Sequence, residues 1–192
     1  MKRKLPRSFY ARDSVVVGPE LLNKVLVVGA RSGRIVEVEA YRGSDDPASH
    51  AGRGPTPRSE IMFGPPGRLY VYFSYGMHWC ANVVCDRPGV AAAVLLRAMA
   101  PLSGLDAMRV ARGSLRSAWD LCSGPAKLTQ AVGVDGSYNG TDLVARGSPV
   151  TVVDDGVPPP EHPVVTTRIG ISVAVERPWR WYVPQDPNVS RR

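Results

Sequence analysis

The segment RIVEVEAY, residues 34–41, decides the fold, because polar and apolar residues alternate along it as they do along a half-buried strand. Its small and branched apolar side chains share one face, which we expect to pack in the core: Val36, Val38 and Ala40. The opposite face carries two carboxylates beside an aromatic ring, from Glu37, Glu39 and Tyr41. That face is either an ordinary solvated surface or one wall of a functional site, and the strand alone leaves both open.

Runs of β-branched and aromatic residues predict further strands on both sides of this segment, at 24–28, 68–75, 79–84, 90–98, 150–153, 167–174 and 180–183. We expect a turn around Ser32-Gly33 to join the strand at 24–28 to the strand at 34–41. Helical patterns occur at 13–22, 103–112 and 124–133. Residues 43–67 contain five prolines and five glycines, which indicates a long loop.

Helices that come late in the chain and do not alternate with the strands are typical of the α+β class. With 192 residues, 44% of them hydrophobic, the chain is large enough for one core. The sequence therefore predicts a single compact domain over 1–192, with a mainly antiparallel curved sheet and short flanking helices. We interpret residues 1–8 as a basic, flexible tail and not as a signal peptide, because no apolar stretch follows closely.

The net charge of +7 comes from 24 basic and 17 acidic residues. A surplus of this kind suits a polyanion such as DNA, although a basic protein without such a partner has the same composition. No run approaches the ~20 apolar residues that span a bilayer. We expect a monomer in the cytoplasm with no membrane partner, associated with the nucleoid in a bacterium or located in the nucleus of a eukaryote.

Three cysteines at wide spacing, without a C-x-x-C pair, argue against a disulfide framework and a zinc site. We expect Cys80, Cys85 and Cys122 to be buried small residues, and we expect neither a metal nor a cofactor.

Arg97 lies in VAAAVLLRAMAPL, residues 90–102, where almost every neighbour is apolar. A charge in such a strand is rarely buried without a partner, and a glutamate on the strand at 34–41 is a natural one. A Glu–Arg pair at a pocket wall can hold and polarise a water molecule, as a general base for hydrolysis does.

An aromatic segment, RLYVYFSYGMHWCAN, covers residues 68–82. Its rings are either core residues or a stacking surface for a base. The turn at Gly76 puts Tyr75 and Met77 at an exposed tip, where an apolar wedge can enter a base stack.

In several blocks the sequence resembles the alkyladenine (3-methyladenine) DNA glycosylase family, and the resemblance covers nearly the whole chain. The blocks are EVEAYRG (37–43), SHAGRGPTPRSEIMFGPPGRLYVYFSYGMHWCAN (49–82), LLRAMAPLSGLDAMR (95–109), LCSGPAKLTQA (121–131) and TRIGIS (167–172). The resemblance implies an enzyme that flips alkylated or deaminated purines out of double-stranded DNA and hydrolyses the N-glycosidic bond. Glu39 then corresponds to the general base, while Arg97 and the main-chain carbonyl of Ile169 hold the water.

The resemblance also implies contacts with the flipped base and with the DNA. Base contacts are implied for Tyr41, His50, Tyr72, Asn82 and Leu95; Asn82 screens against a purine amino group. Tyr75 corresponds to the residue inserted into the duplex, with Met77 and His78 beside it.

Two cations are candidates for phosphate contacts: Lys127 at a helix start, and Arg58 in the long loop. None of the four lysines lies in the pocket-forming segments, so we expect a monofunctional enzyme without a Schiff base. Two alternatives stay open: a nucleic-acid-binding domain that has lost catalysis, and a metal-dependent hydrolase, for which the sequence offers no ligand set.

Overall fold

The computed structural model describes residues 3–113 and 117–190. Its strands form one antiparallel sheet in the order β1-β7-β2-β3-β6-β5-β4, and β9 pairs with both β3 and β8. The strands are β1 (Arg3–Lys4), β2 (Val25–Val28), β3 (Arg31–Arg42), β4 (Leu69–Ser74), β5 (His78–Cys85), β6 (Ala92–Ser103), β7 (Val150–Asp154), β8 (Val164–Thr166) and β9 (Arg180–Tyr182).

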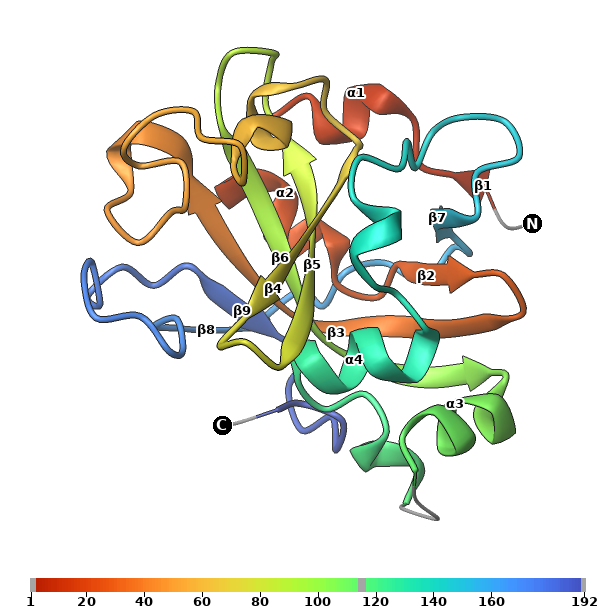
Figure 1. Cartoon of the computed structure of the whole chain (residues 1–192). Coiled ribbons are helices and arrows are strands. Elements are labelled where there is room, and N and C mark those ends of the chain that lie inside the picture. The colour runs from red at the N-terminus through yellow and green to blue at the C-terminus, as the bar shows by residue number, and fades with distance from the viewer. Residues whose placement is uncertain (1–2, 114–116, 191–192) are drawn as a thin grey trace.

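The helices are short. They are α1 (Arg7–Tyr10), α2 (Ser14–Leu21), α3 (Leu105–Ala111) and α4 (Pro125–Val132), with 3-10 turns η1 (Gly43–Asp45), η2 (Glu60–Phe63), η3 (Ala118–Asp120) and η4 (Gly136–Tyr138). Around the curled sheet in Figure 1, α2 packs against β3 and α4 against β5 and β6. The α+β class, the single compact domain and the mainly antiparallel curved sheet are therefore confirmed.

The long strands β3 and β6 form the centre of the sheet and pair over nearly their full length. The register shifts on both sides of Glu37, which marks a bulge in this ladder. All three apolar residues of the segment are buried, as expected. The bulge separates them, however: Val38 and Ala40 pack in the main core, whereas Val36 packs in a small cluster with Ala98 and Val189.

Helix α2 contains Gly18 followed by Pro19, a pair that disfavours a helix. A Cβ atom at Gly18 would lie 3.1 Å from the ring of Trp181 on β9. The glycine thus lets the helix approach the sheet closely, and tertiary packing outweighs the weak local propensity.

Two local predictions are wrong. The β2–β3 hairpin turns at Gly29-Ala30 and not at Ser32-Gly33, because Val28 pairs with Arg31 and Gly29 adopts the positive φ of a tight turn. The segment 167–174 is a loop and not a strand. Its backbone does not pair as a strand: the Ile169 N–H donates to the side chain of Glu39, and Gly170 and Ala174 have positive φ.

Other differences concern the boundaries of elements. The strand predicted at 90–98 continues to Ser103, and the long loop at 43–67 contains η1 and η2. The three cysteines are free and buried, as expected. Within the described residues, no helix is long and apolar enough to cross a membrane.

Residues 3–8 are not the flexible tail that the sequence predicts. Arg3 and Lys4 pair with Asp154 and Val153 of β7, and Leu5 is 4% exposed and packs in the main core. The apolar contact of Leu5 thus fixes the basic segment to the edge of the sheet. Residues 1 and 2 lie outside the described part of the chain.

The buried position of Leu5 leads to a stability prediction. Leu5→Ala removes a core side chain and leaves a cavity, so we expect it to lower the free energy of unfolding by about 2–3 kcal/mol. Val16→Ala, at a position that is 48% exposed, serves as the control, with an expected change within about 0.5 kcal/mol. Urea unfolding of both variants measures the difference, and equal stabilities would restore the interpretation as a tail.

Candidate active site

Glu39, on β3, is completely buried, so the interpretation of its strand face as a solvated surface is wrong. Its carboxylate accepts hydrogen bonds from the Tyr41 hydroxyl at 2.9 Å and from the backbone N–H of Ile169 at 2.7 Å. The Arg97 Nη1 atom lies 3.2 Å from Glu39 Oε1. A carboxylate can be buried at this depth because these three donors replace water.

Arg97 lies between two carboxylates. Its Nε donates to Glu37 Oε1 at 2.9 Å while Nη1 faces Glu39. Glu37, also completely buried, accepts a second bond from Arg180 Nε at 2.8 Å and a third from the Ser190 N–H at 2.7 Å. The network therefore joins β3, β6, β9 and the C-terminal segment.

The two glutamates differ in their proton affinity. Burial raises the pKa of Glu39 above 4.5, and the opposing effects of Arg97 and the Ile169 N–H do not cancel it. Burial acts on Glu37 in the same direction, but there Arg97 and Ser190, with Arg180, outweigh it and lower the pKa. Glu39 is thus the carboxylate that accepts a proton more readily, as a general base requires.

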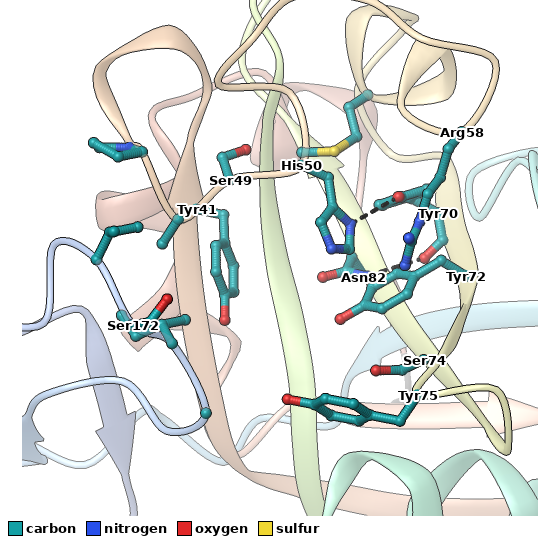
Figure 2. Close-up of a pocket in the computed structure, with 16 residues that line it drawn as sticks. Tyr41, Ser49, His50, Arg58, Tyr70, Tyr72, Ser74, Tyr75, Asn82 and Ser172 are labelled. Atoms are coloured by element: carbon teal, nitrogen blue, oxygen red, sulfur yellow. Dashed lines mark hydrogen bonds between the residues drawn. The ribbon is translucent and has the colours of Figure 1, made fainter.

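A cavity of about 440 Å³ lies between Tyr41 on one side and His50 and Tyr72 on the other (Figure 2). Its volume is in the range of small-molecule pockets. It is lined by Tyr41, Pro47, Ala48, Ser49, His50, Arg58, Met62, Tyr70, Tyr72, Ser74, Tyr75, Asn82, Gly170, Ile171, Ser172 and Val173. Glu39 is not part of this lining, but it accepts a hydrogen bond from the hydroxyl of Tyr41, which is.

The aromatic wall is held rigidly. The rings of His50 and Tyr72 meet edge to face with centroids 4.5 Å apart, and His50 Nδ1 lies 3.0 Å from the Tyr70 hydroxyl. Burial, together with the charge of Arg58, lowers the pKa of His50. His50 is therefore neutral at pH 7, with one donor and one acceptor nitrogen.

Asn82 and Leu95 lie on neighbouring strands under the cavity. Asn82 is in the lining, and its Nδ2 donates to the Tyr70 carbonyl at 3.2 Å. Leu95 pairs with Asn82 on one side and with Glu39 on the other. Leu95 is buried and is not among the residues that line the cavity. Its contact with a bound base therefore stays a prediction.

The turn between β4 and β5 forms an exposed tip, as the sequence predicts. Tyr75 is 80% exposed and Met77 66% exposed, and His78 begins β5 opposite Ser74. Tyr75 has a φ of 50°, which is unusual for a residue with a side chain. Figure 2 shows its ring at the edge of the cavity.

The two predicted phosphate contacts have different surroundings. Arg58 lines the cavity, with its guanidinium 5.0 Å from the centroid of the Tyr72 ring. Lys127, in the first turn of α4, donates to Asp120 Oδ1 at 2.7 Å and lies outside the lining. An acidic partner thus already neutralises Lys127, and its role toward phosphate stays a prediction.

The amide N–H of Ile169 donates to Glu39 at 2.7 Å, and the contact of its carbonyl with the water stays a prediction. The loop of Ile169 is fixed by Arg168, which is buried and bound in two-point fashion to Asp46 of the loop after β3. In Figure 1 these two loops lie on the same side of the sheet.

Four residues of this site were not predicted: Asp46, Arg168, Arg180 and Ser190. Arg168 lies in TRIGIS and Asp46 follows EVEAYRG, and both segments carry the family resemblance. The resemblance could therefore have pointed to these two residues. Arg180 and Ser190 had no comparable signal. Among the described residues, no cluster of His, Cys, Asp or Glu could hold a metal ion.

Comparison with known proteins shows the family of the chain. The sequence profile of the family described as methylpurine-DNA glycosylase (MPG) matches residues 8–187. The chain belongs to the methylpurine-DNA glycosylase family. Membership makes it a DNA glycosylase, an enzyme that acts on DNA.

Similar proteins span almost the whole chain. A protein of Burkholderia lata is 53% identical over 187 residues, which are 97% of this chain and 90% of that protein. A protein of Carboxydothermus hydrogenoformans is 48% identical over 193 residues, 98% and 99% of the two chains. Both carry the name "Putative 3-methyladenine DNA glycosylase".

The buried pair of Asp46 and Arg168 leads to a second stability prediction. Asp46→Asn leaves the Arg168 charge buried without its partner, so we expect the free energy of unfolding to fall by about 3 kcal/mol. Asp106→Asn is the matched control, because Asp106 is 98% exposed and pairs with Arg109 at the surface. Denaturant unfolding compares the two variants, and a loss no larger than that of the control contradicts the structural role of the pair.

Proposed function

We propose that this chain is a monofunctional DNA glycosylase that removes damaged purines from double-stranded DNA and leaves an abasic site. The observation that carries the proposal is the position of Glu39, a buried carboxylate held by Arg97 and the Ile169 N–H and hydrogen-bonded to Tyr41, which lines a cavity with aromatic walls. A purine is flat and fits between such walls, and a carboxylate next to Tyr41 can activate water.

In the proposed reaction, the oxygen of a water molecule attacks C1′ of the deoxyribose. The C1′–N bond breaks, the purine departs with the electron pair, and a water proton passes to Glu39. The sugar carries oxocarbenium character in the transition state, which a nearby carboxylate stabilises. Because Tyr41 donates to Glu39, the proton reaches Glu39 either directly, once that bond opens, or through the Tyr41 hydroxyl.

Access to the cavity requires the nucleotide to leave the base stack, at a cost of a few kcal/mol. The exposed tip at Tyr75 and Met77 supports insertion into the vacated space, because these large side chains are mostly exposed to solvent in the free protein. The tip adjoins the cavity, since Tyr75 belongs to its lining. The protein is expected to act as a monomer.

The absence of a lysine from the described cavity lining supports a monofunctional reaction. Lys4, Lys24 and Lys127 are instead bound to acceptors elsewhere, namely Ala145, Asp154 and Asp120. The product should therefore be an intact abasic strand, with no protein–DNA adduct trapped by borohydride. Activity in the presence of a chelator separates this reaction from that of a metal-dependent hydrolase.

Substitution of the proposed base separates catalysis from binding. We expect Glu39→Gln to reduce the release of hypoxanthine from a duplex by a factor on the order of 10² or more, because a neutral amide cannot accept the proton. Affinity for an abasic duplex should change little. Glu60→Gln, at an exposed position of the long loop, is the control that should retain full activity. Equal release by Glu39→Gln and the wild type shows that the assigned base is wrong, whereas no release by the folded wild type favours a non-catalytic DNA-binding domain.

The raised pKa of Glu39 predicts the pH profile. The base acts as a carboxylate, so activity increases as the pH rises through the pKa of Glu39, and the loss on acidification begins above pH 4.5. Without the positive charge of Arg97, the carboxylate is stabilised less, and Arg97→Gln should move this acid limb to higher pH. Single-turnover rates on hypoxanthine between pH 4 and pH 9 measure the acid limb of the wild type and that of Arg97→Gln. A wild-type rate independent of pH across this range contradicts the assignment.

A further inference from the structure

Arg58 is an exposed residue of the long loop that also lines the cavity. Its guanidinium lies 5.0 Å from the centroid of the Tyr72 ring, and its Nη2 donates to the Phe73 carbonyl at 3.2 Å. Figure 2 shows its side chain extending toward Tyr70 and Tyr72. The loop thus holds a cation against the aromatic wall.

The other charges near the cavity occur in opposed pairs. Glu39 faces Arg97, Glu37 faces Arg180, and Asp46 binds Arg168. Among the described residues that line the cavity, Arg58 is the only charged one at neutral pH, since the lining contains no carboxylate and the pKa of His50 is lowered. The charge that a bound base meets in the lining is therefore positive.

The opposite wall of the cavity, which contains Tyr41, also contacts an arginine. The Arg168 guanidinium lies 4.7 Å from the centroid of the Tyr41 ring, and Arg168 is not part of the lining, so it contacts this ring from outside the cavity. A guanidinium on one face of a ring weakens the attraction of that ring for a second cation on the other face. Tyr72 and Tyr41, one from each aromatic wall, thus each contact an arginine before a base binds.

We infer that Arg58 sets the lesion preference of this enzyme, favouring neutral damaged purines over cationic N-alkylated ones. The inference rests on the proposed function. A neutral purine such as hypoxanthine offers the acceptors O6 and N7 to the donors of an arginine. A purine methylated at N7 has lost one acceptor and carries a positive charge, which Arg58 repels.

The test compares one neutral and one cationic lesion in the same duplex. Single-turnover release of hypoxanthine and of 7-methylguanine is measured at saturating enzyme, with spontaneous depurination subtracted. The quantity of interest is the ratio of the 7-methylguanine rate to the hypoxanthine rate, because a general loss of DNA affinity cancels in it.

We expect Arg58→Gln to raise this ratio about tenfold, because the variant removes the repulsion together with the paired donors of the guanidinium. Arg58→Lys keeps the charge and should leave the ratio within about threefold of the wild type. Arg53→Gln removes an equal charge from the same loop outside the lining and should not change the ratio.

Two results overturn the inference in distinguishable ways. If Arg58→Gln slows both lesions equally, or leaves both unchanged, Arg58 does not discriminate between them, although the wild type still excises both and the proposed function stands. If the wild type releases neither base while it is folded and binds DNA, the proposed function itself fails. Circular dichroism of each variant confirms that it is folded.

Discussion

The burial of two glutamates on one strand is the constraint on which the rest of this site depends. Glu37 and Glu39 are both fully buried, and two carboxylates at that depth are stable only when cations and N–H donors replace the lost hydration. Arg97 serves both of them. Because Arg97 cannot balance both charges alone, Arg180 and the amide of Ser190 complete the network. The chemistry of one residue thus requires four segments of the chain to converge.

This requirement explains why irregular backbone surrounds the site. The bulge beside Glu37 shifts the register between β3 and β6 where Arg97 contacts the carboxylates, and the loop of Ile169 supplies an N–H to Glu39 that a regular strand would give to its neighbour. The Asp46–Arg168 pair then holds that loop against the loop after β3. A satisfied buried network of this kind leaves little freedom for its members, which is the preorganisation that the proposed role of Glu39 as a base needs.

Stability is given up at the mouth of the cavity. Tyr75 combines a positive φ with high exposure, and each of these features is unfavourable in the free protein. The short hairpin that carries Tyr75 is nevertheless anchored, since β4 and β5 pair in full register and Trp79 packs on Phe73. A well-paired hairpin beneath an exposed ring agrees with the proposed insertion of Tyr75 into the duplex.

Local sequence pattern was enough to predict four features: the strand at 34–41, the aromatic strand with its tip, the need of Arg97 for an acidic partner, and the α+β class. Which groups meet across long separations depends on the tertiary structure. Arg180 and Ser190 reach Glu37 from more than 140 residues away, and the strand predicted at 167–174 is a loop because its polar groups bind Asp46 and Glu39. Lys127 donates a hydrogen bond to Asp120. Residues 3–4, predicted as part of a flexible tail, pair with β7 as an edge strand. Periodicity reports only which face of an element is apolar, whereas the partner of a buried charge depends on how distant elements pack.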